Sequence, residues 1–329
     1  MIRFFSGNNP LNVFTLFFLG LLIKLPYFIT PVIPQIQETD GILYIELLKL
    51  LKQPGAVFPT LYPIFAFVLL FTQAITFNGL VNDQKLFPSP NYLLALSFLV
   101  ITSVVPEWNV LSPALIINTI LVMAWPRMVE LYHHPKPKTI LFNIGLGFGI
   151  CSFFYFPSAY LLLLLIVALL LFRPFFLTEW LIAILGILTP FYFLLVYFFV
   201  WDKWYMIDAV VPNQYLRLPN IRFNWEFWVQ FGLIILPLLI GLATSRRYSV
   251  RMLVQTRKSW NFMIFYLIIA LFIPFINSFL GLTHWVLAAV PISLFHAAFY
   301  YYPKKKTLPE LIFWFSLLWI VANYVVLNS

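Results

Sequence analysis

The chain has 329 residues, of which 62% are hydrophobic, 20% are aromatic and only 9% are charged. A soluble domain carries about 25% charged residues, so this composition excludes a water-soluble enzyme and predicts an all-α bundle of membrane-spanning helices. The formal charge of +9 does not indicate a nucleic-acid partner, because the basic residues form short clusters between apolar segments.

Windows of about 20 residues predict roughly 11 spans within a single integral membrane domain that covers residues 1–329. The predicted spans are 11–29, 57–77, 92–106, 109–126, 139–156, 157–173, 177–200, 227–245, 260–279, 282–301 and 309–327. No small-residue cleavage site follows the first apolar stretch, so the first span is expected to be a retained helix and not a signal peptide.

The basic residues predict how the bundle is oriented. With a cytoplasmic N-terminus, the large basic clusters all fall in cytoplasmic loops, and an odd number of spans puts the C-terminus on the outer side. These residues are Lys85, Arg127, Lys136, Lys138, Arg173, Arg246, Arg247, Arg251, Arg257, Lys258, Lys304, Lys305 and Lys306. The cluster at 246–258 is expected to contact anionic lipid headgroups.

Two predicted outer loops are long enough to carry a site, at 30–56 and 201–226. Within the first, Glu46, Lys49 and Lys52 fall three residues apart on one helical face while leucines fill the rest. This pattern predicts an amphipathic helix at 41–52 that lies in the membrane interface. The second loop is rich in Trp, Tyr, Asp and Arg and is expected to lie on the membrane surface.

Polar residues are rare within the predicted spans. Lys24 is expected to extend its ammonium group toward the outer surface, and His296 is expected to bond to a neighbouring backbone group. Asparagine and glutamine are expected to hydrogen-bond between helices, at Gln73, Asn118, Asn143 and Asn277. No acidic residue lies at mid-membrane depth, which argues against a proton-coupled pump.

An acidic pair, Glu38 and Asp40, precedes the predicted interfacial helix. One interpretation is that Glu38, Thr39 or Asp40 caps this helix, because oxygen-bearing side chains satisfy the first N–H groups and acids complement the helix dipole. The other is that Asp40, with Glu38 as second choice, is a general base facing a lipid-linked substrate.

Three features together resemble the GT-C superfamily of membrane glycosyltransferases. They are the acidic first outer loop with its interfacial helix, the FPTLYP segment at 58–63 that enters the second span, and the FFYFPSAY hairpin at 153–160 that precedes a leucine-rich span. The acids here are split as Glu38-Thr39-Asp40, whereas many GT-C enzymes have an adjacent pair. The chain is also similar to an uncharacterised family of bacterial multi-span proteins through its NVLSP segment at 109–113, which implies the bacterial inner membrane.

The GT-C resemblance implies an enzyme that takes a sugar from a polyprenyl-phosphate donor at the outer leaflet, with Asp40 or Glu38 activating the acceptor hydroxyl. Cations are then expected on the departing lipid phosphate, and the candidates are Lys203, Arg217, Arg222 and His284. Tyr44 and Tyr62 are expected to line the substrate groove. A divalent cation is compatible with such an enzyme, although the sequence contains no metal-binding motif.

Other interpretations stay open at this stage. Lys203, Arg217 and Arg222 could pair with the acids of the same loop, Asp202, Asp208 and Glu226, instead of binding phosphate. The chain could also be a non-catalytic membrane subunit that scaffolds an envelope assembly with a protein partner, or a transporter or lipid-handling protein. In every case its surroundings are membrane lipids.

Overall fold

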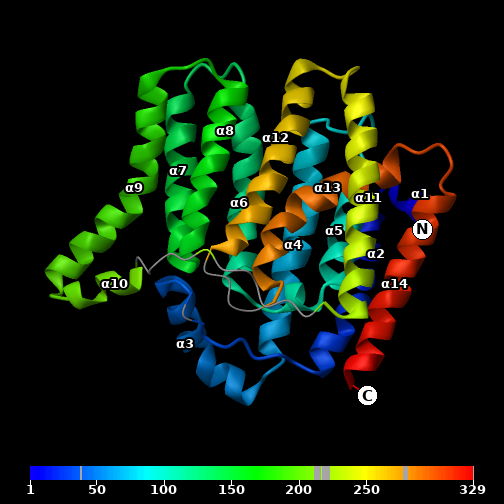
Figure 1. Cartoon of the computed structure of the whole chain (residues 1–329), viewed down its shortest axis with the longest axis horizontal. Helices are drawn as coiled ribbons and strands as arrows, with labels where there is room; N and C mark the ends of the chain where they lie inside the picture. Colours follow the sequence, from blue (N-terminus) through cyan, green and yellow to red (C-terminus); the bar gives the residue numbers. More distant parts are fainter. Residues whose placement is uncertain (38, 211–215, 217–222, 277–280, 329) are drawn as a thin grey trace.

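The computed structural model describes residues 1–37, 39–210, 216, 223–276 and 281–328. These residues form helices joined by turns and short irregular segments, with isolated β-bridges as the one form of strand pairing among them. Within this part of the chain, eight helices are long and apolar enough to cross a membrane. The predicted polytopic helical bundle is therefore confirmed (Figure 1).

The helices follow the predicted spans closely. The eight long ones comprise α2 (Leu11–Ile29), α4 (Leu61–Asp83), α7 (Pro137–Phe154), α9 (Leu177–Val200), α11 (Trp225–Ser249), α12 (Val254–Phe272) continued by η4 (Ile273–Phe275), η5 (Thr283–Ala288) continued by α13 (Ala289–Tyr301), and α14 (Thr307–Asn328). The remaining predicted spans coincide with α5 (Leu93–Val104), α6 (Pro113–Glu130), and η2 (Phe156–Leu161) continued by α8 (Leu162–Phe172). Two of these, α5 and η2–α8, are shorter apolar helices, so a count of 11 spans stays a prediction.

The structure differs from the prediction at the boundary where the third predicted span ends and the fourth begins. The segment between them forms the 3-10 helix η1 (Pro106–Asn109), and α6 begins only at Pro113. The Ser112 hydroxyl caps α6 by accepting a hydrogen bond from the Leu115 N–H at 3.2 Å. Proline is favoured in the first turn of a helix, where its missing N–H costs no hydrogen bond, so Ser112-Pro113 is a strong start signal.

The predicted interfacial helix is present as α3 (Ile42–Val57), which lies across one end of the bundle (Figure 1). Tyr44 and Leu48 are buried against the bundle, whereas Leu50 and Val57 are exposed. Glu46 and Lys49 form an exposed ion pair at 2.8 Å. The helix thus has both an apolar and a charged surface, as an interfacial helix needs.

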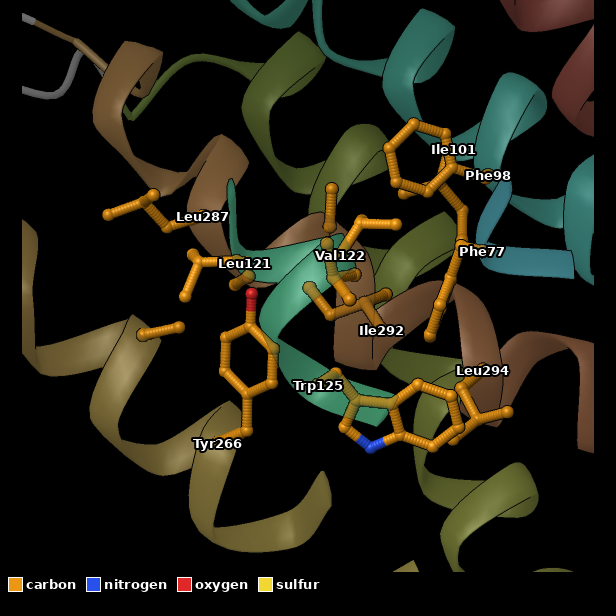
Figure 2. Packing of buried hydrophobic residues seen from close by; sticks show 14 of the residues in the cluster. Phe77, Phe98, Ile101, Leu121, Val122, Trp125, Tyr266, Leu287, Ile292 and Leu294 are labelled. Atoms are coloured by element: carbon orange, nitrogen blue, oxygen red, sulfur yellow. The ribbon is translucent and has the colours of Figure 1, made fainter. Parts of the chain in front are cut away.

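Side chains from α4, α5, α6, α12 and α13 meet in the centre of the bundle (Figure 2). Phe77 and Trp125 pack edge to face there, with ring centroids 5.5 Å apart. Interhelical hydrogen bonds supplement this packing: Asn118 donates to the Val286 carbonyl at 2.6 Å, and Gln73 donates to the Leu115 carbonyl at 2.8 Å. The predicted bonding of these two side chains is confirmed.

The other four polar residues within the predicted spans have different outcomes. The His296 ring bonds to the Ile234 carbonyl at 2.8 Å, as expected. Lys24 was expected to extend outward, and this is wrong, because the residue is buried and its ammonium group donates to Thr102 and Asn109. Lys24 lies on the face of α2 that packs against α5, so acceptors inside the protein replace water. Asn143 lines a shallow pocket beside α6, and Asn277 lies outside the described residues.

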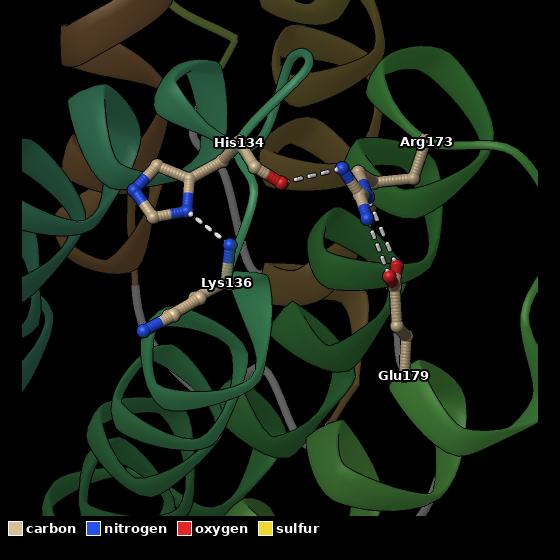
Figure 3. Close-up of polar contacts among 4 residues, drawn as sticks. All are labelled: His134, Lys136, Arg173 and Glu179. Atoms are coloured by element: carbon tan, nitrogen blue, oxygen red, sulfur yellow. Dashed lines mark hydrogen bonds and ion pairs between the residues drawn. The ribbon is translucent and has the colours of Figure 1, made fainter.

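The loops that carry the predicted basic clusters lie at the end of the bundle opposite α3 (Figure 1). Hydrogen bonds fix the Arg173 side chain at this end (Figure 3). Its guanidinium donates to both carboxylate oxygens of Glu179, at 3.0 and 2.6 Å, and to the His134 carbonyl at 2.9 Å. Lys258 donates to the Leu171 carbonyl at 2.6 Å. The separation of basic clusters from the α3 end agrees with the predicted orientation, and which end is cytoplasmic stays a prediction.

Candidate functional site

A cavity of about 290 Å³ lies at the α3 end of the bundle. Its walls come from the segment after α2, the start of α3, η1 with the residues before α6, and the start of η5. The lining residues are Val32, Ile33, Pro34, Gln35, Gln37, Asp40, Tyr44, Glu107, Val110, Leu111, Ser112, Pro113, Thr283 and His284. Segments far apart in the sequence thus bring the predicted residues Asp40, Tyr44 and His284 to one place.

The end of α7 fixes the position of Asp40. Asp40 forms an isolated β-bridge with Tyr155, and the Gly41 N–H donates to the Phe154 carbonyl at 2.8 Å. A Cβ atom on Gly41 would lie 2.1 Å from the Phe153 carbonyl oxygen, so no other residue fits there without a backbone shift. Only glycine at position 41 allows the acidic loop to approach the α7 terminus this closely.

Asp40 lines the cavity, and its carboxyl is largely shielded from water. It is only 7% exposed, and its Oδ2 accepts a hydrogen bond from the Gln37 N–H at 2.8 Å. Burial raises the pKa of Asp40 from its ordinary value of 3.8 to about 6, and the hydrogen bond from Gln37 opposes part of that rise. A carboxylate with such a pKa is suited to accept a proton near neutral pH.

The interpretation of Asp40 as a helix cap is wrong. The N-cap of α3 is Gly41, and no side chain of the described residues, Thr39 and Asp40 included, caps this helix. The carboxyl instead bonds backward to Gln37, within its own loop. The other predicted acid, Glu38, lies outside the described residues.

Glu107, on η1, is a second acid in the cavity that the sequence reasoning missed. Its Oε2 is buried and has no hydrogen-bond partner among the described residues, and burial raises its pKa. Gly281, in a left-handed conformation with φ of 57°, brings the backbone close to the Glu107 side chain. The available signal was an acid in a short outer turn after Pro106, between two apolar helices.

Glu107 also lines a second and larger cavity of about 550 Å³ between the end of α2 and α14. Val32 and Val110 line both cavities as well. Glu107 therefore lies where the two cavities meet. Its carboxyl group can face a molecule in either cavity.

His284, at the start of η5, lines the same cavity as these acids. Its ring packs on the Tyr155 ring with centroids 4.3 Å apart, and its Nε2 is buried without a hydrogen-bond partner among the described residues. The Tyr155 hydroxyl donates to the Ile276 carbonyl at 3.3 Å, which fixes the ring under the histidine. Buried polar atoms in native proteins are nearly always hydrogen-bonded, so the unpartnered atoms of Glu107 and His284 mark the residues around this cavity as a candidate functional site.

The two predicted groove tyrosines have different positions. Tyr44 lines the cavity, with its hydroxyl donating to the Leu111 carbonyl at 2.8 Å, so its ring is the part that faces the space. Tyr62 is not among the lining residues. Its hydroxyl donates to the Leu51 carbonyl at 3.3 Å and packs near Gly55, which holds the end of α3 onto α4.

Of the predicted phosphate-binding residues, the structure describes Lys203 and His284. Lys203 is separate from the lining residues, and its ammonium group donates to the Tyr197 hydroxyl at 3.2 Å. This hydrogen bond raises the pKa of Lys203. Arg217 and Arg222 lie outside the described residues, and His284 is the one described member of the predicted set that lines the cavity.

A resident divalent cation needs several oxygen, nitrogen or sulfur ligands close together. In the part of the chain that the structure describes, no three His, Cys, Asp or Glu side chains come together in a way that could hold a metal ion. The chain's own described residues therefore do not fit a resident metal.

No protein-family model, curated protein or solved structure matches the chain.

Proposed function

We propose that the chain is an integral membrane transferase of GT-C type that moves a sugar from a polyprenyl-phosphate donor to an acceptor hydroxyl, with Asp40 as general base. One observation carries the proposal: Asp40, Glu107 and His284 converge from separate segments on one cavity, and two of them have buried polar atoms without partners among the described residues. Strongly perturbed ionisable groups that share a cavity are typical of functional sites.

The lining of the cavity suits a sugar. Beside the two acids it has short or neutral polar side chains from Gln35, Gln37, Ser112 and Thr283. Hydroxyl groups both donate and accept hydrogen bonds, so carboxyl, amide and hydroxyl side chains can satisfy them in a dry cavity.

The reaction needs one proton acceptor and one leaving group. The acceptor oxygen attacks the anomeric carbon of the donor, and the bond from that carbon to the phosphate oxygen breaks. The Asp40 carboxylate takes the hydroxyl proton, and the electron pair of the broken bond leaves with the polyprenyl phosphate. His284 is assigned to a hydrogen bond with the leaving oxygen, and the phosphate charge is assigned to the predicted arginines of the second outer loop, Arg217 and Arg222.

The proposed orientation puts this chemistry at the outer face of a bacterial inner membrane. The eleven predicted spans then give a cytoplasmic N-terminus and a periplasmic C-terminus. The interfacial helix α3 supports this placement, because its exposed Leu50 and Val57 suit the boundary between headgroups and acyl chains.

A transfer assay tests the proposal. The purified protein in liposomes is supplied with a panel of polyprenyl-phosphate hexoses and pentoses, and release of polyprenyl phosphate is followed. We expect Asp40→Asn to slow release by about 10²- to 10⁴-fold, the usual contribution of a general base. The matched control is Glu46→Gln, which removes an exposed carboxylate of α3 and is expected to leave the rate unchanged.

Two results would contradict the proposal. One is the absence of turnover with every donor by wild-type protein that is folded and correctly inserted. The other is an Asp40→Asn variant as fast as the wild type, and this second result would remove Asp40 from the chemistry even if transfer occurs.

A further inference from the structure

An apolar groove of about 350 Å³ lies next to the cavity, between α11, α12 and η5–α13. Its lining is apolar apart from one polar side chain, Gln230, among the described residues. On α11 it extends from Phe227 to Leu238, which at 1.5 Å per residue is roughly 16 Å along the helix. The groove thus begins at the end of the bundle where the cavity lies and continues along the helices toward their middle.

The groove and the cavity share one wall, formed by η1 and η5. On η1, Glu107 lines the cavity and the adjacent Trp108 lines the groove. On η5, His284 lines the cavity and the adjacent Trp285 lines the groove. Each 3-10 helix therefore presents an ionisable side chain to one space and an indole ring to the other.

Backbone acceptors fix both indole rings. Trp108 Nε1 donates to the Leu282 carbonyl at 2.8 Å, and Trp285 Nε1 donates to the Leu271 carbonyl at 3.1 Å. The ring N–H groups are thereby satisfied, so the indoles present hydrocarbon surface to the groove. The bond between Trp108 and Leu282 also holds η1 against η5. The cavity and the groove therefore keep their positions relative to each other.

The chemistry of the groove selects its occupant. Water finds few hydrogen-bond partners on a lining in which Gln230 is the one polar side chain among the described residues, so the space suits a hydrocarbon chain. The lipid tails of the bilayer are themselves apolar, so a hydrocarbon chain gains little affinity by moving from the bilayer into the groove. The groove instead supplies packing contacts and sets the direction of the chain. Selection among lipids then depends on the head group, which the neighbouring cavity receives.

We propose that this groove holds the hydrocarbon chain of the lipid-linked substrate while the head of the same molecule lies in the cavity beside Glu107 and His284. The identity of the head as a phosphate-linked sugar rests on the proposed function. Occupation of the groove by the chain of a monophosphate lipid is measured without any turnover.

Photolabelling in nanodiscs tests the inference. The probe is a long-chain alkyl monophosphate with a diazirine near the end of its chain, and the comparison is a phosphatidylcholine with the same diazirine. After irradiation, the labelled peptides are mapped by mass spectrometry. We expect the monophosphate probe to label residues 227–238 of α11 and 285–292 of η5–α13 in the wild type, several-fold above the phosphatidylcholine probe.

Variants on α11 provide matched controls. Ile235→Trp puts an indole into the groove and is expected to reduce this labelling about tenfold, because a close-packed site does not accept the added volume together with a chain. Leu236→Trp adds comparable bulk at the neighbouring, exposed position and is expected to leave the labelling unchanged. Asp40→Asn is expected to retain the labelling, which separates this inference from the proposed function.

Three outcomes would overturn the inference. They are equal labelling of the groove by both probes, labelling spread over the lipid-facing surface, and labelling that Ile235→Trp does not reduce. Stoichiometric co-purification of a transmembrane protein that Ile235→Trp releases would also overturn it, because a helix would then occupy the groove. A wild-type peptide map centred on the groove supports the inference even if Ile235→Trp fails to fold.

Discussion

Asp40→Asn is expected to make the protein more stable at neutral pH while it removes transfer activity. Burial raises the pKa of Asp40 from 3.8 to about 6, so the ionised form of this side chain is disfavoured in the folded state. That difference corresponds to about 3 kcal/mol when the carboxyl is fully ionised, an upper figure because the loop can relax. Asparagine never ionises, and its carbonyl oxygen can still accept the hydrogen bond from Gln37.

The sign of the pH dependence follows from the raised pKa. The contribution of Asp40 to stability is fully present below pH 3.8 and is lost as the pH rises through about 6. Thermal unfolding of the wild type and of Asp40→Asn in the same detergent, between pH 4.5 and pH 8, measures the difference. We expect the advantage of the variant to grow across this range, whereas Glu46→Gln shows no such trend.

The wild-type transfer rate provides a second readout of the same group. A general base must be deprotonated, so the rate is expected to rise with pH to a plateau, with a midpoint near 6. An advantage of Asp40→Asn that is constant with pH, together with a flat rate profile, would mean that this carboxyl has an ordinary pKa.

Glu179→Gln is expected to be the most destabilising single change at the end of the bundle opposite α3. The side chains of Arg173 and Glu179 are only 12% and 6% exposed, and their two hydrogen bonds form a fork (Figure 3). Removing one charge leaves the other buried and unpaired, which costs about 3–5 kcal/mol. Arg173 also bonds to the His134 carbonyl, so the loop before α7 is expected to loosen as well.

The exposed pair of Arg127 and Glu130 is the matched control at the same end of the molecule. Glu130→Gln is expected to cost less than about 1 kcal/mol, because water screens and solvates both charges. Thermal unfolding of the two variants in one detergent compares these costs. Equal losses of stability would show that the Arg173–Glu179 pair is hydrated and not buried.

Much of the fold could be predicted from hydropathy and local signals. The helices coincide with the predicted spans because, inside a bilayer, a chain must satisfy its backbone within each helix. The interfacial helix α3 could be predicted from its charge spacing. The boundary before α6 was misplaced because the turn at Pro106–Asn109 is itself helical, so hydropathy alone did not separate it from the spans.

The candidate site could be predicted only in part. Asp40 and His284 were identified by residue type and by their place in the outer segments, and the structure brings both to one cavity. Glu107 was missed because nothing local distinguishes it from an ordinary turn acid. Its importance comes from distant segments, since Gly281 lies close to its side chain and the segment after α2 lines the same cavities. Lys24 was misread for the same reason, since its acceptors Thr102 and Asn109 belong to other segments.

The most direct test is an experimental structure of the protein in nanodiscs with its co-purified lipid retained. We expect density for a lipid head in the cavity, within hydrogen-bond distance of Asp40 and of the unpartnered atoms of Glu107 and His284. A cavity that is closed by the loop after α2, with Glu107 and His284 bonded to protein groups, would contradict a substrate site at this end of the bundle.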